Sequence, residues 1–127
     1  MKEVIAIIRI NKMNETKEAL ANAGFSSISA RECLGRGKGL VDIELLKGAE
    51  KGYEEAVSQL GQTGRLIPKR WLLMVLPDRT VDKAVMTILS VNQTGKSGDG
   101  RIFVLPCQDS IRVRTGESGE EVLDDVA

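Results

Sequence analysis

The chain has 127 residues, with 18 basic and 18 acidic side chains, one Trp, one Tyr, two Phe and no histidine. A chain of this length is expected to form one domain with its own core, and the lack of histidine excludes a Ser-His-Asp triad and any zinc site that uses histidine. The balanced charge and the few aromatic rings argue against a nucleic-acid-binding surface.

The first quarter of the chain predicts a strand, a helix and a second strand. Residues 4–10 are almost all apolar and mostly β-branched, which is typical of a buried strand. Asn14 is expected to cap a helix over residues 15–23, and Gly24 to end it in the left-handed conformation. The alternating pattern over residues 25–35 predicts the second strand.

The middle of the chain is rich in glycine and weakly patterned. A short alternating ribbon is expected at residues 41–45 and a two-turn helix at residues 53–60. Connections longer than about 15 residues within a compact domain are usually functional or disordered. We therefore interpret residues 37–67 as a long mobile loop that contacts a partner protein, with a flexible insertion of no function as the alternative.

The second half predicts another strand and the clearest helix. Residues 71–76 are apolar at every position, which indicates a strand buried on both faces. Apolar side chains recur at helical spacing over residues 81–89, with Asp78 or Thr80 as the expected cap and Gly95 beyond the end.

Strands are also predicted at residues 101–105 and 111–114, before an acidic tail that is expected to be solvated and frayed. The domain is predicted to span residues 1–115 and the tail residues 116–127. The order strand, helix, strand, long loop, strand, helix, strand predicts the α+β, ferredoxin-like βαββαβ fold, an antiparallel sheet with two helices on one face. The other face is apolar and predicts assembly through the sheet.

No stretch is long and apolar enough to act as a signal peptide or membrane span. Cys33 and Cys107 are far apart in the sequence, and two unpaired cysteines indicate a reducing compartment. We expect a cytoplasmic protein without membrane insertion.

Residues 94–101 have the composition of an anion-binding loop. Gly95-Lys96-Ser97 imitates the end of a P-loop, but Ser90 replaces the required glycine and the motif follows a helix. Three glycines nonetheless allow close backbone approach to an anion, and Lys96 and Arg101 add positive charge. An ordinary turn is the alternative.

Arg112 and Arg114 alternate on the last predicted strand, which would place both guanidinium groups on one face about 7 Å apart. Such a pair suits a polyphosphate, with a solvated basic face as the alternative. The glycines and cations of residues 35–39 form a third cluster, and one phosphorylated ligand would explain all three. Asp99 could bind a ribose or a metal-bound water, but no activated nucleophile is evident, which favours binding without turnover.

The chain resembles the PII nitrogen-regulatory signal-transduction proteins. The matching stretches are residues 2–9, 18–20, 47–50, 75–78, 93–96, 98–104 and 111–117.

The resemblance implies a trimer of ferredoxin-like subunits that binds ATP or ADP in clefts between neighbours, and 2-oxoglutarate beside ATP-bound Mg²⁺, with no catalysis. It assigns to the nucleotide Ile7, Ile28, Ser29, Gly35, Gly37, Lys38, Val75, Thr94, Gly98, Asp99, Gly100 and Arg101, with Arg112 and Arg114 from the adjacent subunit. It assigns Lys69, Gly37 and Lys38 to 2-oxoglutarate.

Two positions depart from the family pattern. The motif Gly-Arg-Gln-Lys-Gly is shortened here to Gly37-Lys38-Gly39, so the glutamine that ligates Mg²⁺ is missing, and Gln59 or Gln62 would have to replace it. Lys51 stands where some members carry a modifiable tyrosine, and Tyr53 comes two positions later.

The long loop and these departures resemble the branch associated with nitrogenase. The resemblance implies a homotrimer, or a mixed assembly with a second PII-like subunit, that inhibits a nitrogenase component until 2-oxoglutarate relieves the block. One alternative is a PII protein that regulates glutamine synthetase, an ammonium channel or a transcription regulator. Another is a small nucleotide-dependent enzyme. An RNA-recognition sheet is disfavoured because Phe103 is its only plausible stacking residue.

Overall fold

The computed structural model describes residues 1–37 and 66–123. The ribbon predicted at residues 41–45, the helix predicted at residues 53–60 and Lys38 lie outside the described residues. The elements are β1 (Lys2–Ile8), η1 (Ile10–Lys12), α1 (Met13–Asn22), β2 (Ser29–Gly35), β3 (Ile67–Leu76), α4 (Asp78–Asn92), β4 (Arg101–Pro106) and η2 (Glu120–Val122).

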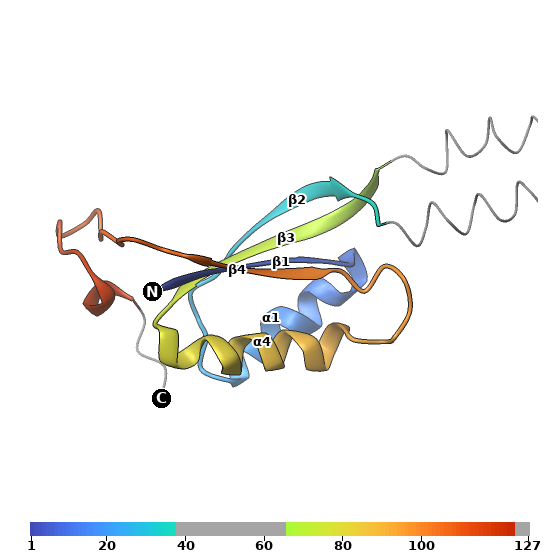
Figure 1. The fold of residues 1–127 in the computed structure, drawn as a ribbon, viewed down its shortest axis with the longest axis horizontal. Helices are drawn as coiled ribbons and strands as arrows, with labels where there is room; N and C mark the ends of the chain where they lie inside the picture. The colour runs from blue at the N-terminus through green and yellow to red at the C-terminus, as the bar shows by residue number, and fades with distance from the viewer. Residues whose placement is uncertain (38–65, 124–127) are drawn as a thin grey trace, which may run out of the picture.

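The four strands form one antiparallel sheet in the order β2-β3-β1-β4. Both helices cover the same face of this sheet, as Figure 1 shows. This arrangement confirms the predicted ferredoxin-like α+β fold.

The core lies between this face and the helices, because alternate residues of the central strands point toward it. It is formed by Val4, Ala6 and Ile8 of β1, Leu72, Met74 and Leu76 of β3, Met13 and Leu20 of α1, Val81, Ala84 and Ile88 of α4, and Phe25. Burial of these side chains, at roughly 25 cal/mol per Å² of apolar surface, is the main favourable contribution to folding.

The opposite face of the sheet carries the residues between these core positions. Ile5, Trp71 and Leu73 are only half-buried, and Phe103 is 42% exposed. Arg31 lies over the Trp71 ring, 4.1 Å from its centroid. Among the described residues no helix covers this face. Within one subunit β3 is therefore fully buried on one face only, and not on both faces as its apolar run predicted.

The C-terminal end of α1 follows the prediction, whereas the N-terminal caps of α1 and α4 differ from it. Gly24 has φ +97° and ends α1, and Phe25 N donates to Leu20 O at 2.8 Å, as in a Schellman motif. Asn14 is not the cap, because η1 leads directly into a helix that begins at Met13. Pro77, whose side chain cannot cap, precedes α4, so neither Asp78 nor Thr80 caps it.

The C-terminal segment differs most from the prediction. Residues 111–114 are not a strand: Ile111 forms an isolated bridge with Ser118, and Gly116 N donates to Arg112 O at 2.7 Å in a tight turn. The tail is not frayed up to residue 123, since Glu120 pairs with Arg79 at 2.9 Å. Residues 124–127 lie outside the described part of the chain.

Within residues 1–37 and 66–123, no helix has the length and hydropathy needed to cross a membrane. The thiols of Cys33 and Cys107 are both free.

Candidate ligand-binding site

The loop between α4 and β4 is organised around the carboxylate of Asp99. Oδ2 accepts hydrogen bonds from the backbone N–H groups of Thr94 at 2.8 Å and Gly95 at 2.9 Å. Oδ1 accepts from the Thr94 hydroxyl and from Arg9 Nη1, at 2.7 Å in the latter case. The Thr94 hydroxyl first, and then these backbone and guanidinium donors, hold the pKa of Asp99 well below its usual range.

Two glycines let this loop pass close to the end of β1. Gly100 has φ +108°, and a Cβ at this position would lie 2.0 Å from the backbone oxygen of Ile7. Gly98 has φ +96°, and its Cβ would lie 3.3 Å from Arg9 Nη2. Only glycine adopts these conformations readily, so both positions require it.

Cationic side chains from other elements reach the same loop. Lys69 of β3 donates from Nζ to Gly98 O at 3.2 Å, and Arg9 donates from Nη2 to Ser97 O at 3.0 Å. Gly35, at the end of β2, lies against Lys69, whose Cγ is 3.8 Å from the position of a Cβ at residue 35. Residues from β1, β2, β3 and the loop before β4 therefore converge on one place.

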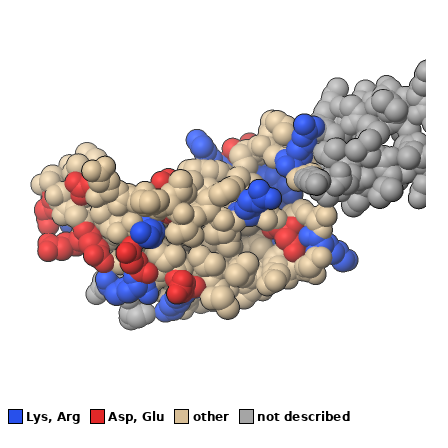
Figure 2. Space-filling view, viewed as in Figure 1, with Lys and Arg blue, Asp and Glu red and all other residues tan. Residues whose placement is uncertain are grey.

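We call this convergence the anion cluster, defined as Ile7, Arg9, Gly35, Lys69 and residues 94–101. In Figure 2, Lys and Arg side chains are prominent at the end of the molecule toward the grey residues. The anion cluster thus brings the predicted anion-binding loop, residues 94–101, together with Ile7, Gly35 and Lys69. Gly37 is exposed just beyond β2.

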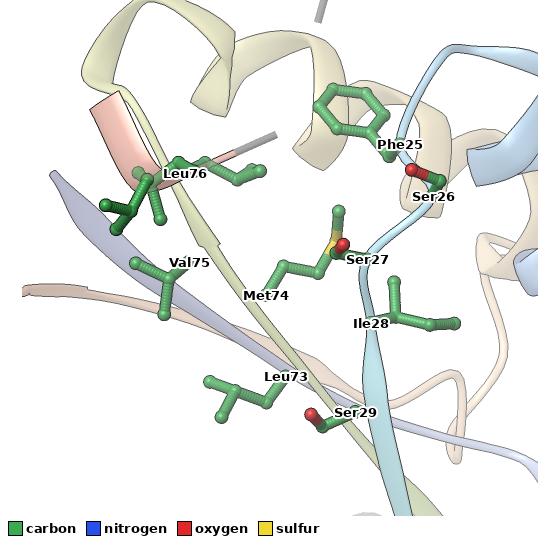
Figure 3. A pocket seen from close by; sticks show the side chains of 11 residues that line it. Phe25, Ser26, Ser27, Ile28, Ser29, Leu73, Met74, Val75 and Leu76 are labelled. Atoms are coloured by element: carbon green, nitrogen blue, oxygen red, sulfur yellow. The ribbon is translucent and has the colours of Figure 1, made fainter. Parts of the chain in front are cut away.

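A second feature is a cavity of about 340 Å³ beside the end of β3. We call it the β3-end cavity; it is lined by residues 25–29 and 73–76, with Val122 and Leu123 (Figure 3). Three of the predicted nucleotide residues, Ile28, Ser29 and Val75, are in its wall. The C-terminal segment thus forms part of this cavity.

Arg112 lies next to the β3-end cavity and not in the anion cluster. Its Nη2 donates to Val122 O at 3.4 Å, and its Nη1 is 3.5 Å from Glu117 Oε1. Arg114 is exposed on the following turn. The expectation that both guanidinium groups share one strand face is wrong, because residues 111–116 turn back instead of extending.

The two groups of predicted residues lie at opposite ends of the sheet. In Figure 1 the loop before β4 is at one end and the C-terminal segment is at the other. A ligand shared by Arg101 and Arg112 of the same subunit is therefore excluded by the geometry.

The functional residue that sequence analysis missed is Arg9, a charge at the end of an otherwise apolar strand. Asp99 was considered as a group that binds a ribose or a metal-bound water. In the structure its carboxylate is instead engaged by Arg9, Thr94 and Gly95. In the part of the chain that the structure describes, no group of three or more Cys, Asp or Glu side chains is arranged to hold a metal ion.

Comparison with known proteins gives concordant matches over almost the whole chain. The family model described as Nitrogen regulatory protein P-II matches residues 1–117. "Nitrogen fixation nifHD region GlnB-like protein 2" of Methanobacterium ivanovii is 46% identical over 125 residues, which cover 97% of this chain and 99% of the relative. "Nitrogen regulatory protein P-II" of Rhodobacter capsulatus is 41% identical over 123 residues, which cover 97% and 100%. The crystal structure of Arabidopsis thaliana PII bound to citrate superposes with a TM-score of 0.70 at 26% identity, covering 99% of this chain and 91% of that one.

Proposed function

Because the chain belongs to the family of nitrogen regulatory proteins P-II, we propose that it is a sensor that binds ATP or ADP together with 2-oxoglutarate. In this proposal it controls nitrogenase activity by direct contact and has no catalytic step of its own. The observation that carries the proposal is the anion cluster.

The anion cluster is suited to phosphate groups. Its loop bends at Gly95, Gly98 and Gly100, all with positive φ, so that backbone N–H groups can approach an anion closely. The negative charge of Asp99 is offset by Arg9, and the exposed Lys96 and Arg101 remain near the loop as cations. Charge-assisted hydrogen bonds from such donors are the usual means of holding phosphate.

The arrangement within one subunit supports an assembly with the site between subunits. The anion cluster and the β3-end cavity with Arg112 lie at opposite ends of the sheet. A ring of subunits joined head to tail would therefore place the anion cluster of one subunit next to the β3-end cavity of its neighbour. The open sheet face, with the exposed Phe103 and Leu105, supplies apolar surface for the contact. We therefore propose a homotrimer, or a mixed assembly with a second PII-like subunit.

The same cluster supports a place for 2-oxoglutarate. Lys69 would pair with one of its carboxylates, with Gly37 and Lys38 beside it. Lys69 Nζ already lies on the loop, 3.2 Å from Gly98 O. Since the carboxylate of Asp99 is engaged by protein donors, it does not fit as a direct Mg²⁺ ligand. The metal would be held by the ligands themselves, as ATP-bound Mg²⁺.

The target contact is proposed for residues 37–67. Gly35 and Ile67 are paired in the sheet, and Gly35 lies against Lys69, so a ligand in the cluster would lie where this segment leaves and rejoins the fold. A ligand that binds one conformation of the segment more tightly shifts its population. The nitrogen-fixation names of relatives such as the one from Methanobacterium ivanovii support a nitrogenase component as the target.

Isothermal titration calorimetry with ATP, ADP and 2-oxoglutarate, alone and combined, tests the proposal. We expect saturable nucleotide binding, tighter 2-oxoglutarate binding with MgATP present, and no ATP consumption over hours. A nitrogenase assay with and without the protein then tests the target: inhibition that 2-oxoglutarate relieves is expected. Steady ATP hydrolysis would instead support a small nucleotide-dependent enzyme. Binding of glutamine synthetase, an ammonium channel or a transcription regulator would support the other PII functions.

A further inference from the structure

The C-terminal segment supplies one wall of the β3-end cavity. Val122 and Leu123 line the cavity together with residues 25–29 and 73–76, which are shown in Figure 3. Both side chains are half-buried. The acidic end of the chain, for which the sequence predicts a solvated tail, thus places two apolar side chains against a cavity.

Contacts with distant parts of the chain hold this segment in place. Glu120 Oε1 pairs with Arg79 Nη1 of α4 at 2.9 Å. Gly119 has φ +92°, a conformation that favours glycine, and its N–H donates to Ser110 O at 2.8 Å. We call residues 119–123 the C-terminal strap. Its position is therefore set by the fold and not by the local sequence alone.

The lining of the β3-end cavity suits the base of a nucleotide better than its phosphates. It combines three serines of the segment 26–29 with apolar residues such as Leu73 and Val75, and no described Lys or Arg is part of it. Hydroxyl groups can orient the polar edge of a base, while apolar side chains pack against its faces. Arg112 lies just outside, where its Nη2 donates to Val122 O at 3.4 Å, so the phosphates would lie there.

We infer that the C-terminal strap is part of the nucleotide site, in which Val122 and Leu123 cover the base bound in the β3-end cavity and contact it directly. This inference rests on the proposed function and adds two specificity-determining residues to it. The volume of about 340 Å³ is present with the strap in place, and it falls within the range of small-molecule pockets, about 300–1,000 Å³. The base therefore does not have to displace the strap. Instead, the strap removes apolar surface of the base from water.

Isothermal titration calorimetry of the full-length protein with ATP tests this cover. Leu123→Ser should weaken ATP binding by roughly four- to fifteenfold, the worth of one or two buried CH₂ groups. The matched control is Met86→Ser, which also replaces an apolar side chain by serine. Met86 is 65% exposed on α4, so this variant should bind ATP like the wild type.

A second pair of variants tests the attachment of the strap. Glu120→Ala removes the contact with Arg79, whereas Glu121→Ala removes the same charge from the adjacent exposed residue. Both changes alter the long-range attraction for an anionic ligand alike, so the difference between them reports the attachment. We expect ATP to bind Glu120→Ala more weakly than Glu121→Ala, by up to about fivefold, which is the limit for an exposed ion pair.

NMR of the wild type detects the contact without any variant. Adenosine carries the base and no phosphate, and it should shift the methyl resonances of Val122 and Leu123 in a saturable manner. Inorganic tripolyphosphate, which has no base, should leave these resonances in place.

The results that would overturn the inference differ from those that would overturn the proposed function. ATP binding that is unchanged in Leu123→Ser, or tighter because the strap competes with the nucleotide, would refute the cover alone. So would methyl resonances of Val122 and Leu123 that do not move at saturating ATP or adenosine. If neither ATP nor ADP binds the wild type, the proposed function fails and this inference fails with it.

Discussion

Arg9 and Asp99, ninety positions apart in the sequence, are joined by an ion pair of 2.7 Å between Nη1 and Oδ1. This pair ties the end of β1 to the loop before β4. Since the same carboxylate accepts hydrogen bonds from Thr94 and Gly95, it sets the shape of the loop. The anion cluster is thus formed only when β1 and β4 have come together.

Asp99→Asn should destabilise the protein at neutral pH and much less in acid. The folded pKa of Asp99 lies below the unfolded value of about 3.9. Its contribution to stability is therefore present above that value and is lost as the pH falls through the folded pKa. Urea denaturation of the wild type and the variant at pH 7 and in acid would show the difference in unfolding free energy narrowing. Asp82→Asn, an exposed change on α4, is the control, and an equal difference at both pH values would contradict the assignment.

Gly100→Ala should destabilise the fold more than Gly95→Ala. Both residues have positive φ, a conformation that costs roughly 1–2 kcal/mol for a residue with a Cβ. At Gly100 the new Cβ would also collide with the backbone of Ile7, whereas at Gly95 no atom lies within 4 Å. Urea denaturation measures both losses. Equal losses would show that β4 can shift away from β1 without cost.

Arg112→Ala should weaken ATP binding by at least tenfold, if its guanidinium contacts phosphate with the usual worth of a charge-assisted hydrogen bond. Glu117→Gln should have the opposite effect, because Glu117 lies 3.5 Å from the guanidinium and competes for it. Exposed ion pairs are worth about 0.2–1 kcal/mol, so the gain should not exceed about fivefold. Calorimetry measures both, with Lys17→Ala on α1 as control. Unchanged affinity in Arg112→Ala would remove this residue from the site.

Lys69→Gln should abolish 2-oxoglutarate binding while nucleotide binding is largely kept. The ammonium group is the cation proposed to pair with a carboxylate of 2-oxoglutarate, and glutamine keeps a donor for Gly98 O but no charge. Calorimetric titration of 2-oxoglutarate in the presence of MgATP measures the loss. Lys17→Gln should bind like the wild type. Retained affinity in Lys69→Gln would place the carboxylate elsewhere.

Phe103→Asp should break the proposed assembly into smaller species. Phe103 is 42% exposed on the open face of β4, and a buried unpaired charge at a subunit contact is unfavourable. Light scattering after size exclusion gives the mass. Met86→Asp on α4 is the matched control, because Met86 is 65% exposed on the helix side. A wild-type mass equal to one subunit, or an unchanged mass in Phe103→Asp, would refute assembly through this face.

The fold could be predicted because its signals are local. The apolar runs of β1 and β3 and the periodicity of α4 are properties of neighbouring residues, and burial of Val4, Leu72 and Ile88 confirms them. The family and its nitrogen-fixation-associated branch, suggested by short motifs, are confirmed by the family model and the relatives from methanogens.

The parts that could not be predicted depend on long-range or three-dimensional context. Arg9 and Asp99 meet only through strand pairing, so spacing in the sequence did not reveal them. Residues 111–114 alternate like a strand, but a strand needs a neighbour, and within the described parts of the chain Ile111 forms an isolated bridge with Ser118. The buried Asn92 donates from Nδ2 to Thr16 Oγ1 and Ile88 O, a pair of bonds that helical periodicity does not specify.

The pairing of Gly35 with Ile67 makes the connection between β2 and β3 a suitable site for inserting another sequence. Gly35 and Ile67 are held together by the pairing of β2 and β3, so the chain between them begins and ends at neighbouring points. The entropic contribution to the free energy of closing such a connection rises by only about 0.6 kcal/mol for each doubling of its length. A fluorescent reporter grafted between these anchors should leave the subunit folded. For the same reason, connections of different length from related proteins should be exchangeable at this point without changes to the sheet.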